Sequence, residues 1–394
     1  EALKANTVGK QNIAVGYRSM YYNTTSINNV SIGYLAMYDN TIGTQNTAVG
    51  SYALTDNTTG ERNVAIGYRT LFVNTTGRYN TAVGWHALSS TTGDGNVAVG
   101  YETLKANTIG SLNSALGYQA LTANTTGNYN TALGYNALFS NTTGVTNTAV
   151  GFYALKDNTG GTYNIAVGHS ALENNLTGSL NTAMGGNALK DNLGSSNVAI
   201  GYGALADNTT GIENVAVGRD TLTVATTGKR NVAIGSFTLL ALTSGQENAA
   251  VGFRAMQTTT IGGNNAALGT YALQANTTGN YNVAVGGQAM YLNTTGTSNT
   301  AVGFQSLAAN TIGQWNTAVG TQALNANTTA NFNTAIGNLA LNKNTIGEQN
   351  VAVGDEALET NTTGGRNTAV GMRALERNTI GQYNVAVGNE ALKF

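Results

Sequence analysis

The residue types that carry most enzymatic chemistry are scarce in this chain. Its 394 residues include no cysteine and only two histidines, His86 and His169, which lie in different copies of a repeated motif. Neither histidine has the serine and aspartate partners that a nucleophilic triad requires. Aspartate also fails to recur at fixed places in the glycine-rich turns, as it does in calcium-binding repeats. We therefore predict that the chain is not an enzyme and has no metal site and no bound cofactor.

One row of aromatic residues is a candidate binding surface. An aromatic residue follows the glycine of the motif in many repeats of the first half, and we take as the candidate stripe Tyr17, Tyr34, Tyr68, Trp85, Tyr101, Tyr118, Tyr135, Phe152 and Tyr202. Two interpretations stay open. The rings stack between neighbouring repeats and stiffen the chain, or they form an exposed strip that contacts a glycan, a partner fibre or other subunits.

The Asn-Thr-Thr segments raise two further hypotheses, ice binding and glycosylation. An ice-binding face needs two outward threonine rows two residues apart on a flat strand. Thr142 and Thr143 are adjacent, so strand geometry would send them to opposite faces. Ten Asn-Thr-Thr segments, such as the one at Asn141, match the N-glycosylation motif and would give a sugar-coated face in a glycosylating host.

A single repeated unit must position all of these residues. The motif Asn-x-Ala/Ser-aliphatic-Gly opens 23 repeats between Asn12 and Asn384. The spacing is 17 residues, except for 16 from Asn80 to Asn96 and from Asn181 to Asn197. We number the positions of the repeat from its opening asparagine. A short, fixed period of this kind predicts a solenoid in which each repeat forms one coil.

The composition of the repeat favours strands over helices. Two glycines and a β-branched run in each repeat disfavour a helix, and proline is absent. We predict an all-β fold, a parallel β-solenoid or β-roll of about 23 coils stacked about 4.8 Å apart. The Thr-Ala-Val and Ala-Leu segments are its expected strands. Position 4 is always aliphatic and position 9 is Leu or Met, so we expect both to fill the core. Asparagines at positions 1 and 12 are expected to form stacked ladders.

The distribution of charge indicates which positions face solvent. The net charge is -1, only 9% of residues are charged, and every charged residue falls at position 6, 7, 10, 11, 16 or 17. Charged side chains are rarely buried unpaired, so these positions are expected on the outside. The low charge predicts no nucleic-acid binding, and the lack of a long apolar run predicts no transmembrane segment. We expect residues 1–394 to form one solenoid domain with uncapped ends, as part of a longer fibre or an end-to-end stack.

The NTAVGYxAL and NVAVGxxAL segments, for example at 46–54, 63–71 and 214–222, resemble the head repeats of YadA-type trimeric autotransporter adhesins. The resemblance implies a left-handed parallel β-roll, a homotrimer, and display on an extracellular cell surface that contacts host matrix or other cells. The repeats are also similar to those of tail-fibre-type proteins, which are trimeric too. The usual coil of the adhesin family is shorter than 17 residues, and the Asn-Thr-Thr-Gly segment is additional.

These features together predict a structural and adhesive extracellular fibre that provides reach and multivalent contact. Self-association as a homotrimer or a filament is expected, with a host-matrix, cell-surface or glycan ligand. One alternative is a binder of ice or glycan that acts through a regular face. Another is the shaft of a viral or phage tail fibre. The fibre is favoured because the outer positions vary while the inner positions are strict, and a lattice binder needs the reverse.

Overall fold

The computed structural model describes residues 1–393, which form short β-strands and turns and no helix. The chain divides into two compact units. The first covers residues 1–195, and the second runs from Ser196 to the end of the described residues. The boundary falls in the second of the two 16-residue repeats.

Every repeat contributes one strand of three residues, at positions 2 to 4. The strands of the first unit are β1 (Ile13–Val15), β2 (Val30–Ile32), β3 (Thr47–Val49), β4 (Val64–Ile66), β5 (Thr81–Val83), β6 (Val97–Val99), β7 (Ser114–Leu116), β8 (Thr131–Leu133), β9 (Thr148–Val150), β10 (Ile165–Val167) and β11 (Thr182–Met184). Those of the second unit are β12 (Val198–Ile200), β13 (Val215–Val217), β14 (Val232–Ile234), β15 (Ala249–Val251), β16 (Ala266–Leu268), β17 (Val283–Val285), β18 (Thr300–Val302), β19 (Thr317–Val319), β20 (Thr334–Ile336), β21 (Val351–Val353), β22 (Thr368–Val370) and β23 (Val385–Val387).

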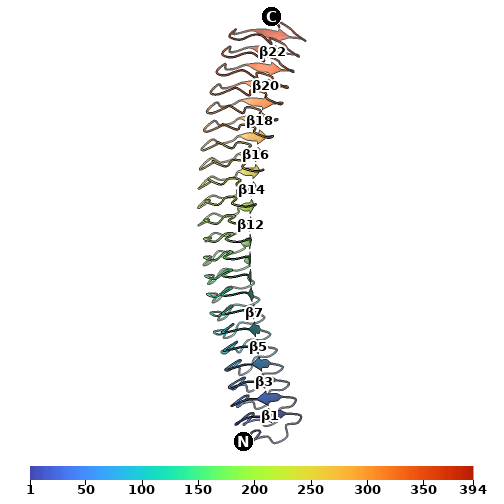
Figure 1. The fold of residues 1–394 in the computed structure, drawn as a ribbon, viewed down its shortest axis with the longest axis vertical. Helices are drawn as coiled ribbons and strands as arrows, with labels where there is room; N and C mark the ends of the chain where they lie inside the picture. Colours follow the sequence, from blue (N-terminus) through green and yellow to red (C-terminus); the bar gives the residue numbers. More distant parts are fainter. Residues whose placement is uncertain (394) are drawn as a thin grey trace. The chain divides into compact units, whose positions relative to one another are not determined.

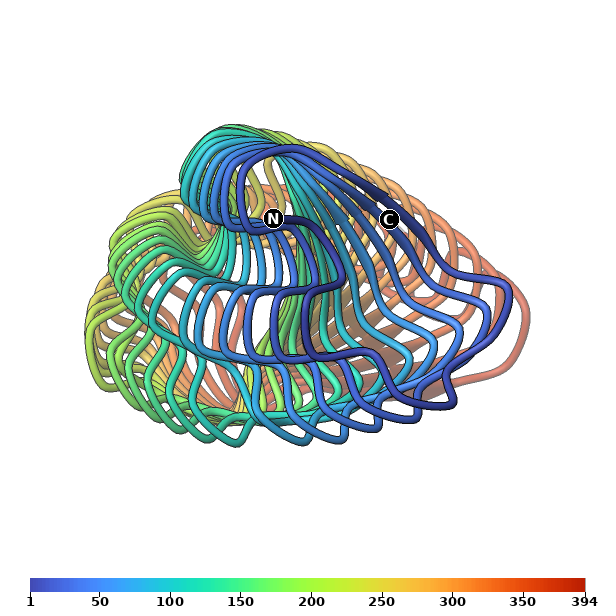
Figure 2. The ribbon, with the colours of Figure 1, turned by 90° about the horizontal axis from the view of Figure 1, so that it is seen from below.

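Within each unit, neighbouring strands pair in parallel and in register. Ala132 lies opposite Ala115 on one side and Ala149 on the other, and the same pairing recurs from repeat to repeat. Figure 1 shows that the strands of each unit follow one another in chain order, and Figure 2 shows the chain completing one circuit for each repeat. The prediction of an all-β parallel solenoid with one coil per repeat is confirmed.

The expected second strand, at the Ala-Leu segment, is wrong. In the repeat that opens at Asn130, the backbone is left-handed at Asn136 (φ 52°), Leu138 (φ 51°) and Thr146 (φ 57°). Left-handed residues cannot continue a β-strand, so this segment forms a turn. Its backbone still bonds to the next repeat, because the N–H of Leu138 donates to the carbonyl of Ala154 at 3.0 Å. Positions 7, 9 and 17 are left-handed throughout the described repeats that follow the 17-residue pattern.

The apolar core is formed by positions 3, 8 and 9, and the expectation that position 4 fills it is wrong. Ala132, Ala137 and Leu138 are buried, whereas Leu133 at position 4 is 43% exposed. Successive side chains of a strand point to opposite faces. Because the alanine at position 3 faces the interior, positions 2 and 4 must face outward.

The opposite side of the interior holds the asparagine ladders, which confirms that prediction. The Nδ2 of Asn130, at position 1, donates to the carbonyl of Gly144 at 2.9 Å. Asn141, at position 12, donates to the same carbonyl at 3.1 Å and to Oδ1 of Asn124 in the preceding repeat at 2.9 Å. These buried amides satisfy turn carbonyls that water cannot reach. The interior of each coil is therefore half apolar and half amide.

Candidate interaction surface

The outward face of the strands is the most regular surface of the molecule. We call it the strand face and define it as the side chains at positions 2 and 4. Leu116 is 48% exposed, and Ile66, Met184 and Leu268 are also exposed at position 4. Position 2 adds exposed Val97 and other Val, Ile and Thr side chains. Water-exposed aliphatic residues scattered singly are ordinary, but a contiguous row of them indicates a site that another surface covers.

The strand face carries no charge in either unit. No Lys, Arg, Asp or Glu occurs at positions 1 to 5 in any repeat. A shallow hollow of about 250 Å³ lies on this face between Val97, Val99, Leu116 and Leu133, and its floor contains Ala115. An uncharged aliphatic face can pack against another apolar surface without desolvating a charged group.

The strand face was missed by reasoning from the sequence because a strict aliphatic row was assigned to the core. The signal that could have identified it is the alternation within the strand. The interior has little room beside the asparagine ladders, and alanine or serine occupies position 3 in every repeat. A small residue at the centre of a three-residue strand, with larger residues on both sides, indicates that the centre is the inward position.

The predicted aromatic stripe is brought together as a discontinuous ladder at the edge next to the strand face. Rings of neighbouring repeats stack nearly parallel from Tyr101 through Tyr118 and Tyr135 to Phe152, with centroids 5.0, 5.1 and 5.2 Å apart. His169 continues this stack on Phe152 at 5.2 Å.

The other stripe residues lie outside this four-ring stack. Tyr17 stacks on Tyr34, and Tyr68 stacks on Trp85. Tyr202 lies in the second unit and is exposed. Most of these rings are exposed. Within the stacks the ring faces contact one another, so solvent contacts mainly the ring edges. This geometry favours the stiffening interpretation over flat stacking of a ligand on this row.

The two histidines lie among aromatic rings. His86 lies beside Tyr68 and Trp85, with ring centroids 5.6 Å from each. Burial lowers the pKa of His86, and the positive charges of Lys105 and Arg69 lower it further. His169 ends the stack described above.

One group of carboxylates lies close enough to hold a metal ion. Oxygens of Glu356, Glu359 and Glu376 lie within 4.8 Å of one another. The Nε of Arg373 donates to Glu356 at 2.5 Å, and the Nζ of Lys343 lies 3.1 Å from Glu359. Lys393 lies 3.6 Å from Glu376, so three cations face the three carboxylates and the group forms a surface ion-pair network.

The threonine rows and the glycosylation motifs are used within the fold. The Oγ1 of Thr125 donates to the carbonyl of Thr142 at 3.0 Å, and that of Thr142 donates to Thr159 at 3.1 Å. These hydroxyls are therefore engaged with backbone carbonyls. Asn141, the acceptor residue of one motif, is fully buried and its amide donates to two partners. A glycan cannot be attached to such a side chain while the repeat is folded.

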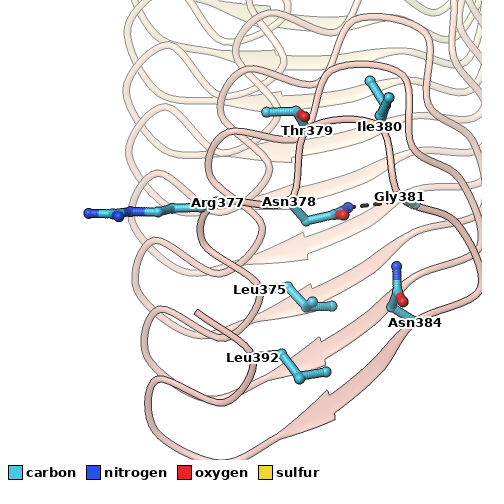
Figure 3. A pocket seen from close by; sticks show the side chains of 8 residues that line it. All are labelled: Leu375, Arg377, Asn378, Thr379, Ile380, Gly381, Asn384 and Leu392. Atoms are coloured by element: carbon cyan, nitrogen blue, oxygen red, sulfur yellow. Dashed lines mark hydrogen bonds between the residues drawn. The ribbon is translucent and has the colours of Figure 1, made fainter. Parts of the chain in front are cut away.

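A hollow of about 380 Å³ lies inside the last described turn. Figure 3 shows that Leu375, Leu392, Asn378 and Asn384 point toward it, while Arg377 points away. The Nδ2 of Asn378 donates to the carbonyl of Gly381 at 3.2 Å (Figure 3). These are positions 9, 12 and 1, whose equivalents are buried in earlier repeats. The hollow is the solenoid interior seen end-on, so it is not a separate ligand site.

No helix in residues 1–393 is long and apolar enough to cross a membrane. Comparison of the chain with protein-family models, with curated proteins and with solved structures finds no match.

Proposed function

We propose that this chain is a self-associating structural protein, a β-solenoid fibre that acts on an extracellular surface by reach and multivalent contact. The observation that carries the proposal is the strand face. Its position 4 is aliphatic in all 23 repeats although it is not part of the core. A solvent-exposed position tolerates polar residues, so its strict apolar character requires another explanation. Burial against another molecule of the same chain provides one.

The size of the strand face is consistent with a stable contact between molecules. Three residues at about 3.3 Å and a strand spacing of about 4.8 Å give roughly 50 Å² for each repeat. The eleven strands of the first unit would then bury roughly 1,000 Å² in total between two molecules, which reaches the lower range of specific interfaces. The absence of charged groups on this face removes the desolvation cost that would oppose such a contact.

The resemblance to YadA-type head repeats and to tail-fibre repeats supports a homotrimer among the possible assemblies. In such an assembly, the charged and irregular positions 6, 7, 10, 11, 16 and 17 would remain outside and contact host matrix, cells or other partners. The extracellular location and the adhesive role rest on this resemblance and on the repeat architecture. The shaft of a viral or phage tail fibre would use the same strand face, and it would differ only in being attached to a virus particle instead of a cell.

An ice-binding face is the second candidate, and the strand face is where it would lie. Positions 2 and 4 are two outward rows two residues apart, the spacing that such a face needs. Threonine occurs at position 2 in some repeats, as at Thr131 and Thr148, but never at position 4. A face with one strictly aliphatic row fits another protein surface better. A thermal-hysteresis measurement equal to buffer would remove this candidate.

Two single-cysteine variants test whether the strand face is covered, because the natural chain contains no cysteine. Leu116→Cys places a thiol on the strand face, and Thr126→Cys in the same repeat places one at exposed position 14. We expect a maleimide reagent to label Thr126→Cys quickly and Leu116→Cys at least ten-fold more slowly. The difference should disappear when assembly is disrupted by dilution. Equal labelling rates for the two variants, at concentrations at which the chain is assembled, would refute the proposal.

A further inference from the structure

A second row of aromatic side chains lies at position 17, the last residue of the repeat. Its members are Tyr79, Tyr129, Tyr163, Tyr281, Trp315, Phe332 and Tyr383. All are more than half exposed, and all have left-handed φ values between 55° and 60°. Because the backbone conformation is the same at each of them, the side chains leave the backbone in the same direction.

The rings of this row turn their faces toward the neighbouring repeat. Trp315 and Phe332 stack at 4.9 Å with an interplanar angle of 6°. The guanidinium of Arg62 lies over the ring of Tyr79 at 5.3 Å. Arg366 lies over Tyr383 at 5.2 Å in the same way. These separations match the spacing of about 4.8 Å between parallel strands, so the rings of Tyr79, Trp315, Phe332 and Tyr383 present a face along the stacking direction of the repeats.

The row is interrupted by one small residue at two places. Tyr281 and Trp315 lie on either side of Ser298, and Tyr129 and Tyr163 lie on either side of Thr146. Within residues 1–393, no ring or cation stacks on Tyr129, Tyr163 or Tyr281.

Backbone hydrogen bonds hold the first of these gaps in register. The N–H of Ser298 donates to the carbonyl of Asn280 at 3.0 Å, and the N–H of Trp315 donates to Thr297 at 3.2 Å. The two residues that bear the rings on either side of Ser298 are therefore held two coils apart by the fold itself.

The size of the gap selects a puckered ring over a flat one. Two coil spacings separate the flanking rings by about 9.6 Å. A flat aromatic ring with carbon contacts of about 3.5–4.0 Å on each side spans only roughly 7–8 Å. A pyranose chair is thicker, because C–H groups project from both of its faces. Those C–H groups suit the electron-rich faces of Tyr281 and Trp315.

The polar groups beside the gap are neutral. Position 16 holds Asn280, Thr297 and Gln314 in the three repeats concerned, and position 17 holds the hydroxyl of Ser298. All four are partly exposed. The Asn280 amide already bonds within the fold, because its Oδ1 accepts from the N–H of Gly263 at 2.7 Å and its Nδ2 donates to the carbonyl of Thr278 at 2.9 Å. The amide of Gln314 and the hydroxyls of Thr297 and Ser298 can exchange hydrogen bonds with sugar hydroxyls, and no charged residue of these repeats stands at position 16 or 17 to favour an ionic ligand.

We propose that the gap formed by Tyr281, Ser298 and Trp315 is a subsite for one pyranose ring of a neutral carbohydrate. The gap formed by Tyr129, Thr146 and Tyr163 is a second subsite of the same kind in the other unit. Each subsite binds weakly by itself, and repetition along a polysaccharide or across an assembly raises the overall affinity. The subsites use position 17 and do not depend on the strand face.

Tryptophan fluorescence tests the subsite directly. The chain has two tryptophans, so Trp85→Tyr leaves Trp315 as the only indole. Tyrosine is common at the position of Trp85, and the fold is expected to persist. We expect cellotriose, chitotriose or maltotriose to produce a saturable change in Trp315 fluorescence. In the same background, Ser298→Tyr fills the gap with a residue that position 17 accepts elsewhere, and it should weaken binding at least ten-fold.

Asn264→Tyr is the matched control. It adds a ring on the other side of Tyr281 and leaves the gap at Ser298 open, so binding should persist. The proposal is overturned if none of the three sugars changes the fluorescence, or if Ser298→Tyr binds as well as its parent. Equal loss in Asn264→Tyr, or tighter binding of the flat ligand adenosine than of every sugar, would also overturn it. Circular dichroism establishes that each variant is folded.

Discussion

The two asparagine ladders differ in what each residue supports. Asn130, at position 1, donates to the carbonyl of Gly144, and its Oδ1 accepts the backbone N–H of Asn147 at 3.0 Å. Asn141, at position 12, bonds a side chain and a carbonyl but supports no backbone N–H of the next repeat. This difference explains why asparagine occupies position 1 in every repeat while position 12 accepts Ala225 and Leu242.

Replacing each asparagine by leucine tests this difference. Asn130→Leu leaves a buried N–H of Asn147 unpaired, and each such group costs about 1–3 kcal/mol. Asn141→Leu reproduces what occurs naturally at Leu242 and should cost clearly less. Hydrogen exchange followed by mass spectrometry on peptides of these repeats measures the local opening free energy, which suits a long repeat array better than a single melting curve. Equal effects of the two substitutions would contradict this explanation.

Asp56 is a carboxylate in an unfavourable place. Burial raises its pKa above the ordinary value of 3.8, and the negative charge of Asp39 in the preceding repeat raises it further. A raised carboxyl pKa means that the folded state prefers the protonated form. The contribution of Asp56 to stability is therefore present at low pH and is lost as the pH rises through the folded-state pKa.

Asp56→Asn should accordingly raise the thermal stability at pH 7, and the gain should vanish when the pH falls below 3.8. Asp157→Asn is the control at the same position of another repeat. Asp157 lies 3.4 Å from the Nζ of Lys156, so its replacement should give no gain. Thermal melts at neutral and acidic pH provide the measurement. A destabilised Asp56→Asn variant at pH 7 would show that the reasoning is wrong.

At the scale of the coil, the two glycines of the repeat have different roles. Gly151, at position 5, has φ +136°, and a Cβ there would lie 2.5 Å from the carbonyl oxygen of Gly168. Both the conformation and the contact exclude a side chain. Gly161, at position 15, has no left-handed φ, although a Cβ there would lie 2.4 Å from both Oδ1 of Asn158 and the carbonyl oxygen of Gly178. Ala330 and Ser26 occupy this position naturally.

Alanine substitutions should therefore have unequal effects. We expect Gly151→Ala to cost about 2–4 kcal/mol of local stability, because strain at a glycine-only conformation adds to a backbone clash. Gly161→Ala should cost less, because its backbone clash with Gly178 is not joined by a glycine-only conformation and alanine occurs naturally at this position as Ala330. Local hydrogen exchange in the repeats around each site gives the comparison. If the position 15 variant were the more disruptive one, the turn geometry described here would be incorrect.

How far the sequence predicts the coil depends on which interaction fixes each part. The 17-residue period predicts the stacking, because residues that recur in register pair in register. The asparagine ladders follow from the residue type and the spacing. The turn at Ala-Leu was not predictable, because left-handed backbone at leucine is unfavourable locally and is imposed by stacking between repeats. Whether the side chain at position 4 faces inward or outward depends on how little room the interior offers. The sequence of a single repeat does not show how much room there is.

The candidate surfaces were predicted to different extents. The aromatic stripe from Tyr17 to Tyr202 could be identified from residue types alone, although its stacked geometry could not. The strand face was not predicted, because an aliphatic residue is expected equally where its own chain covers it and where another chain covers it. Position 17 was overlooked because its aromatic residues are scattered among charged, amide and small ones, and the gaps matter only once the coil spacing is known.

At the scale of the whole molecule, the positions of the repeat fall into three sets. Positions 1, 3, 8, 9 and 12 build each coil. Positions 2 and 4 form an uncharged face that another molecule would cover, and the charged positions remain outside.

Disrupting the uncharged face at positions 2 and 4 should change assembly without unfolding the chain. Leu116→Asp combined with Leu133→Asp is expected to reduce the assembled fraction at least ten-fold at equal concentration, while the circular dichroism spectrum stays unchanged. Loss of the β signal in this variant would place these side chains in the core after all.

The central claim is that the strand face is covered by other molecules of the same chain. The most direct measurement is the mass of the native protein in solution, by mass photometry over a range of concentrations. We expect a species at an integer multiple of 40.5 kDa, three-fold for the homotrimer, that gives way to single chains on dilution. A single species of 40.5 kDa at every concentration would contradict it.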